Sequence, residues 1–148
     1  MGRTETRPAT PEDLGPLYEL HRQALGEYVR QTWGWDERWQ ARRFRERFDA
    51  SHTQVIQQCG RDVGCLRVRR GDNEIFLEYI TLWPQYQRQG IGTRLIRALM
   101  EEARSRCVPL RLSVLRANPA TELYLRLGFQ LTGGDEHRHT MEWRAKEI

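Results

Sequence analysis

Apolar residues along the chain follow two different spacings, and these predict a mixture of strands and helices. Positions 75–83 are rich in β-branched and aromatic residues, which predicts a central strand that ends at Pro84, because proline cannot donate to a sheet ladder. After a short polar segment, apolar residues recur at helical spacing over 91–103. A turn that contains Gly90 and Gly92 therefore joins the central strand to the start of a helix.

The same two spacings assign elements to the rest of the chain. A strand over 3–8 precedes a helix that Thr10 caps, and Asp36 caps a second helix that runs to about Phe48. The later elements are strands at 53–58 and 62–68 before the central strand, then a strand at 110–115, a helix from Asn118 to Gly128, and a hairpin of 129–132 and 138–144. The order β-α-α-β-β-β-α-β-α-β-β predicts a mixed α/β (α+β) sheet covered by helices, in a single domain of residues 1–148.

The turn before the 91–103 helix has the features of an anion site. Free backbone N–H groups and the positive end of the helix dipole meet at a helix N-terminus, and glycines let a bulky anion approach. Two common phosphate patterns fail here, because a dinucleotide fingerprint needs glycine in place of Leu95, and a P-loop needs a lysine, whereas Lys146 is the only lysine of the sequence. A tight turn without a ligand is the remaining alternative from these local features.

Composition narrows the classes of function. The 148 residues carry a net charge of +4, contain no apolar run of membrane-spanning length and begin without the apolar core of a signal peptide. The three cysteines lack Cys-x-x-Cys spacing and the histidines lack His-Glu-x-x-His spacing, so we expect reduced thiols, a cytoplasmic protein and no metal. The arginines are scattered and often stand beside acids, as in 42–47, which is typical of a solvated helix face and does not indicate a nucleic-acid or membrane partner.

Two motifs resemble those of the GNAT superfamily of N-acetyltransferases. The first is Gln87-x-x-Gly90-x-Gly92, which is similar to the pyrophosphate-binding signature Gln/Arg-x-x-Gly-x-Gly/Ala of that family. The second begins at Asn118-Pro119-Ala120, passes through Leu123-Tyr124 and ends at Leu127-Gly128-Phe129. The resemblance implies a GNAT-like fold, in which two central parallel strands splay apart to admit the pantetheine arm. It also implies an acetyl-CoA-dependent N-acetyltransferase that acetylates a primary amine of a small molecule or peptide by direct transfer in a ternary complex.

The resemblance further implies which residues hold acetyl-CoA. Pantetheine contacts fall on the backbone at the end of the central strand, at Ile80, Thr81 and Leu82. Pyrophosphate contacts fall mostly on backbone amides of the following loop, at Gln87, Arg88, Gln89, Gly90, Ile91, Gly92 and Thr93. Asn118 is expected to hold the arm of the cofactor near its thiol end.

Acetyl transfer requires a neutral amine, stabilisation of the carbonyl oxygen and a proton for the departing thiolate. Tyr124 aligns with the proton-donating tyrosine of many GNAT enzymes, although neighbouring leucines also favour a core tyrosine. Glu78 is the candidate base, because a carboxylate in an apolar strand is costly unless it faces water or a partner. The alternatives for Glu78 are a salt-bridged or surface carboxylate, with the amine proton leaving through water.

Three tryptophans lie within 33–39, between the first two helices, which is unusual for a connector. One interpretation is that they seal the edge of the core. The other interpretation follows from the resemblance, since this region often contacts the acceptor in the GNAT family. The resemblance therefore assigns acceptor binding to Trp33, Trp35, Asp36 and Gln40. An aromatic wall with a carboxylate suits a cationic amine.

The main alternative function is a non-catalytic acyl-CoA-binding sensor or interaction domain on the same fold. Such a protein would bind acetyl-CoA without turnover. Dimers are common in the GNAT family, so a homodimer is the assembly that the resemblance favours.

Overall fold

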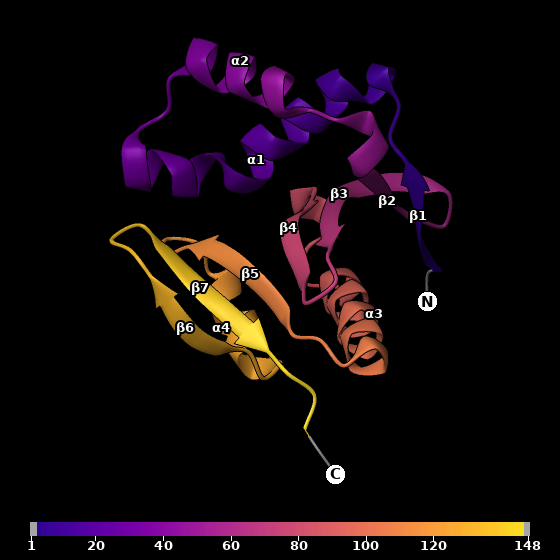
Figure 1. Ribbon diagram of the computed structural model, residues 1–148. Helices are drawn as coiled ribbons and strands as arrows, with labels where there is room; N and C mark the ends of the chain where they lie inside the picture. Colours follow the sequence, from indigo (N-terminus) through magenta and orange to yellow (C-terminus); the bar gives the residue numbers. More distant parts are fainter. Residues whose placement is uncertain (1–2, 147–148) are drawn as a thin grey trace.

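The computed structural model describes residues 3–146 and contains a seven-stranded mixed sheet with helices on both faces (Figure 1). The strands are β1 (Thr4–Pro8), β2 (Gln54–Gln58), β3 (Arg61–Arg70), β4 (Ile75–Leu82), β5 (Leu110–Leu115), β6 (Gln130–Gly134) and β7 (Arg138–Trp143). The helices are α1 (Leu14–Trp33), α2 (Glu37–Arg47), α3 (Ile91–Arg106) and α4 (Ala120–Arg126). This order confirms the predicted fold class, and three short 3-10 turns, at Pro11–Asp13, Ala50–His52 and Pro84–Tyr86, are additions to it.

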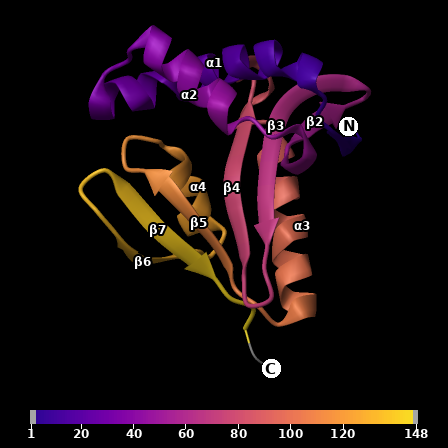
Figure 2. The same ribbon diagram turned by 45° about the horizontal axis from the view of Figure 1, so that its top comes forward.

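The two central strands, β4 and β5, are parallel and separate after a short pairing. The strand order is β1-β2-β3-β4-β5-β7-β6, and the other neighbouring pairs are antiparallel. β4 and β5 pair only from Ile75↔Leu110 to Leu77↔Leu112, although β4 continues to Leu82. Figure 2 shows the two ribbons diverging toward the end of the sheet that α1 and α2 cross. The predicted splay of the central parallel strands is therefore confirmed.

Each face of the sheet has its own hydrophobic core. On one face, Ile91, Ile96 and Leu99 of α3 pack with Tyr124 of α4 against inward residues of the central strands. On the other face, α1 and α2 pack on β2, β3 and β4 through a smaller cluster around Leu17. Amphipathic helices that cover both faces explain why the strands are rich in apolar residues rather than strictly alternating.

A β-bulge in β4 changes which face each side chain meets. Arg67 of β3 pairs with Tyr79, but the next residue pairs with Leu77, so Glu78 is the extra residue of β4. Before the bulge Leu77 packs in the larger core, whereas after it Tyr79 packs in the smaller one. The bulge thus presents a carboxylate at the point where β4 leaves β5.

Polar side chains fix the ends of the first two helices. The Asp13 carboxylate accepts a hydrogen bond from the backbone N–H of Thr10 at 2.8 Å. The Asp36 carboxylate accepts one from the backbone N–H of Trp39 at 3.0 Å. Arg7 of β1 donates to Asp13 and Asp62, which fastens the start of the first helix to the sheet. Between residues 3 and 146, no helix combines the length and apolar character needed to cross a membrane.

Candidate active site

A cleft of about 1350 Å³ lies where β4 and β5 separate. Its floor is formed by residues 76–80 of β4 and 112–115 of β5, and its sides come from α1, α2, α4 and β3. Eight of the predicted site residues line this cleft: Trp33, Trp35, Asp36, Gln40, Glu78, Ile80, Asn118 and Tyr124. Residues that are far apart in the sequence therefore meet at the predicted point of strand separation.

The loop before α3 forms a second surface outside the cleft lining. Gly90 caps α3 with φ +84°, and Arg88 also has a positive φ of 62°. The backbone N–H groups of residues 90–93, which are the N-cap and the first three residues of α3, donate to no acceptor in the described chain. Four free donors at the positive end of a 16-residue helix suit an anion.

Gln87 ties this loop to the end of β4. Its side-chain amide donates to the backbone carbonyl of Leu82 at 2.9 Å. This contact gives the first residue of the Gln87-x-x-Gly90-x-Gly92 motif a structural role that fixes the loop against the strand.

The end of β4 lacks a strand partner on its β5 side. Residues 79–82 pair with β3, and within the described chain no residue of β5 pairs with β4 beyond Leu77. Thr81 is buried, and a Cβ atom placed on Gly64 of β3 would lie 2.3 Å from the Thr81 carbonyl oxygen. The glycine lets the two strands approach here, which holds the free edge of β4 in place.

Tyr124 is buried in the lining of the cleft. Its ring packs against Phe129 with 5.6 Å between the centroids, and its hydroxyl makes no hydrogen bond with another described residue. Burial raises the pKa of Tyr124 to about 12, so the hydroxyl carries its proton at neutral pH. Tyr124 is therefore a core tyrosine that also lines the cleft.

Glu78 is held by an ion pair. Its carboxylate lies 3.2 Å from Nη1 of Arg69, and 28% of its side chain is exposed. The salt-bridged alternative is thus present in the structure, while the same carboxylate also faces the cleft.

Asn118 begins the α4 turn and lines the cleft. Its Oδ1 accepts from the backbone N–H of Ala120 at 2.9 Å, as expected of a helix-capping asparagine. Its amide NH2 group donates to no other residue of the described chain.

The three tryptophans of residues 33–39, Trp33, Trp35 and Trp39, line the cleft and lie outside both hydrophobic cores. Trp33 is 53% exposed, and its ring contacts His137 and the guanidinium of Arg138, at the start of β7. Trp35 donates its indole N–H to Glu37 at 2.5 Å. The end of α1 thereby reaches the hairpin on the other side of the cleft.

Sequence reasoning did not assign a site role to His21, which also lines the cleft. Its Nδ1 lies 2.7 Å from the Tyr79 hydroxyl, and burial lowers the pKa of His21 to about 4, so the ring is neutral at pH 7. Its ring packs against Tyr18, Trp35 and Phe44. A histidine on an otherwise apolar helical stripe was the available signal for this position.

Several arginines of the cleft were also missed. The run at 42–47 indicated a solvated helix face, and its four arginines are exposed, but Arg43 and Arg47 also line the cleft. Arg67 and Arg69 of β3 lie there too. No sequence signal could have found this group, because the two pairs come from different elements.

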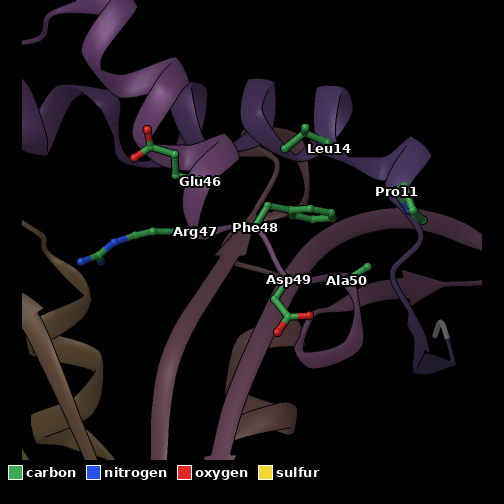
Figure 3. Close-up of a pocket in the computed structure, with 7 residues that line it drawn as sticks. All are labelled: Pro11, Leu14, Glu46, Arg47, Phe48, Asp49 and Ala50. Carbon is green, nitrogen blue, oxygen red and sulfur yellow. The ribbon is translucent and has the colours of Figure 1, made fainter.

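A smaller pocket of about 600 Å³ lies between the start of α1 and the end of α2 (Figure 3). The Phe48 ring points toward Leu14 and Pro11 there, while the Arg47 side chain extends away. None of the predicted site residues lines this pocket, so the larger cleft is the candidate active site. Residues 3–146 contain no group of three or more histidine, cysteine or acidic side chains arranged to hold a metal ion.

Comparisons with known proteins identify the family of the chain. A family model described as the acetyltransferase (GNAT) domain matches residues 49–131. Mouse (Mus musculus) thialysine N-epsilon-acetyltransferase is 32% identical over 147 aligned residues, which cover 88% of this chain and 86% of that protein. The chain therefore belongs to the GNAT acetyltransferase family, and it is an N-acetyltransferase.

Solved structures of GNAT proteins share the fold. PaiA N-acetyltransferase from Thermoplasma acidophilum, in complex with coenzyme A, superimposes with a TM-score of 0.77 at 19% identity, covering 97% of this chain and 99% of that one. Ribosomal-protein-S18-alanine N-acetyltransferase from Escherichia coli gives a TM-score of 0.68 at 22% identity, with coverages of 99% and 96%.

Proposed function

We propose that this enzyme transfers an acetyl group from acetyl-CoA to a primary amine by direct attack in a ternary complex. The observation that carries the proposal is the cleft itself, in which Tyr124 and Glu78 line the opening beside the unpaired edge of β4. The coenzyme A in the archaeal structure and the amine acceptor in the name of the mouse relative support acyl-CoA and an amine as the two substrates.

The free edge of β4 supports a place for the thioester. A backbone N–H of residues 80–82 can donate to the carbonyl oxygen as negative charge develops there. Farther along, the free N–H groups of residues 90–93 can bind the pyrophosphate, with Gln87 holding the loop and the Asn118 amide facing the arm.

The transfer step forms the amine N–C bond and breaks the C–S bond. Tyr124 gives its hydroxyl proton to the departing thiolate, as its protonated state at neutral pH and its place in the cleft allow. Glu78 accepts the proton that the amine loses, and Arg69 keeps this carboxylate in place. Proton loss to water is the alternative route, and Glu78→Gln separates the two.

The cysteine chemistry supports direct transfer. Cys65 lines the cleft, whereas Cys59 and Cys107 are exposed elsewhere. Burial raises the pKa of Cys65 to about 12, so it is a neutral thiol and a poor nucleophile at pH 7. An acyl-enzyme at Cys65 is therefore disfavoured.

The test begins with isothermal titration of the protein with acetyl-CoA, followed by a thiol-release assay over a panel of primary amines. We expect micromolar binding and amine-dependent thiol release, with intact-mass spectra showing unmodified protein after incubation with acetyl-CoA. Binding without turnover of any amine would instead support the acyl-CoA sensor. With Glu78→Gln we expect a loss of about a hundredfold in kcat, and an unchanged kcat would assign the proton to water.

A further inference from the structure

Four arginines of the cleft gather on two facing elements, and we refer to them as the arginine cluster. Arg43 and Arg47 lie one helical turn apart on α2, and Arg67 and Arg69 alternate along β3 so that both lie on one face of the strand. Nη2 of Arg67 donates to the backbone carbonyl of Arg47 at 3.3 Å, so the two pairs meet where α2 approaches the sheet.

The charge of this cluster is only partly balanced. Asp36 and Glu78 are the carboxylates of the described chain that line the cleft. Asp36 caps α2 and Glu78 pairs with Arg69, while Arg43, Arg47 and Arg67 have no carboxylate of residues 3–146 within 4.0 Å. The Nε of Arg67 is buried without a hydrogen-bond partner among these residues. The buried free donor of Arg67 is unfavourable, and the neighbouring cations raise the positive potential of the cleft even though Arg43 and Arg47 are exposed, so a bound anion would be stabilised by both.

Helix stability does not account for the cluster. The dipole of α2 favours cations in its last turn, which explains Arg45 and Arg47 but not Arg43, Arg67 or Arg69. Arg43 instead stacks over Trp39, with 5.1 Å from its guanidinium carbon to the ring centroid, and both line the cleft. Stacking fixes the orientation of a guanidinium while leaving its N–H groups free for a ligand.

The loop at 87–93 is a separate surface, since none of its residues lines the cleft. The arginine cluster is therefore placed on the acceptor side of the proposed reaction, beside Glu78. Guanidinium groups bind carboxylate and phosphate in a bidentate geometry.

We infer, building on the proposed function, that the acceptor carries an anionic group, a carboxylate or a phosphate, in addition to its amine, and that the arginine cluster binds this group. The amine then reaches Glu78 and Tyr124 from the same cleft.

The test compares amines that differ in one anionic group. L-lysine is paired with L-lysinamide, and O-phosphoethanolamine is paired with ethanolamine, in the thiol-release assay at saturating acetyl-CoA. We expect kcat/KM to be at least about tenfold higher for the anionic member of one pair, mostly through a lower KM. The pair that shows the preference also distinguishes carboxylate from phosphate.

Matched variants locate the effect. Arg43→Gln combined with Arg47→Gln should reduce the preference to near unity, while the Kd for acetyl-CoA stays close to that of the wild type. Arg42→Gln combined with Arg45→Gln removes the same charge from the same helix outside the cleft lining, and it should keep the preference.

Two results would overturn the inference while leaving the proposed function intact. One is equal kcat/KM for both members of each pair in the wild type, and the other is an equal loss of preference in the two double variants. Turnover of none of the four amines, despite acetyl-CoA binding, would count against the proposed function and the inference together.

Discussion

The loop before α3 and the arginine cluster are both suited to anions, but they are built from different groups. The loop offers backbone N–H groups of residues 90–93 and the dipole of α3. The cluster offers guanidinium groups from α2 and β3, which meet only after the chain has folded. A backbone site depends on local conformation, whereas a side-chain site depends on tertiary packing.

Arg7 shows how an arginine with a structural role differs from the cluster. Its guanidinium donates to Asp13 at 2.9 Å and to Asp62 at 2.8 Å, so two carboxylates balance one cation. Arg111 is likewise flanked by Glu74 and Glu142. Arg43, Arg47 and Arg67 lack such partners in the described chain and also line the cleft, and these two features together are the reason to assign them a ligand.

Tyr124→Phe tests whether catalysis can be separated from binding at the two anion sites, the loop before α3 and the arginine cluster. We expect kcat to fall by about 10²- to 10⁴-fold, because the thiolate loses its proton donor. The Kd for acetyl-CoA and the KM for the amine should change little, because phenylalanine keeps the packing against Phe129. Steady-state thiol release and isothermal titration measure these quantities.

Tyr86→Phe is the matched control, since Tyr86 packs against the same core outside the cleft lining. It should keep wild-type kcat. A wild-type kcat in Tyr124→Phe would remove Tyr124 from the reaction and leave it as a core residue.

Gly90→Val tests the backbone site alone. Gly90 has φ +84°, and a left-handed conformation costs an L-residue about 1–2 kcal/mol, more when it is β-branched. We expect the loop to rearrange and acetyl-CoA binding to weaken at least about tenfold, equivalent to about 1.4 kcal/mol. Isothermal titration measures the loss.

Gly60→Val supplies the comparison for backbone strain. Gly60 has a similar φ of +80° in the β2–β3 turn, and a Cβ atom there would meet no atom within 4 Å. This variant should lose similar stability in urea denaturation yet bind acetyl-CoA normally. Equal weakening of acetyl-CoA binding in both variants would show that the Gly90 effect comes from lost stability.

The contrast between local and tertiary features also separates what the sequence predicts from what it does not. The order of strands and helices follows from two periodicities, and the loop follows from Pro84, Gly90 and Gly92. The Glu78 bulge could not be predicted, because register depends on the partner strand. Two further features join segments that are distant in the sequence: the contact of Trp33 with His137, and the arginine cluster. A single sequence carries no signal of such contacts.

Asp13→Asn gives the smallest expected effect, and it tests the balanced arginine against the cluster. The hydrogen bond from Arg7 lowers the pKa of Asp13 to about 2, below its ordinary value of 3.8. A lowered pKa in the folded state means that the ionised carboxylate stabilises the protein above about pH 4, and that this contribution is lost as the pH falls through about 2. The Arg7–Asp13 pair lies near the surface, so we expect the Asp13→Asn variant to be less stable than the wild type by about 1 kcal/mol at pH 7.

This difference in the free energy of unfolding should shrink toward pH 2 in urea denaturation. The control variant Asp72→Asn, in the exposed β3–β4 turn, should have the stability of the wild type at every pH. Acceptor KM should stay unchanged in Asp13→Asn, because Asp13 and Arg7 lie outside the cleft lining; a raised KM would show that the two kinds of arginine are coupled.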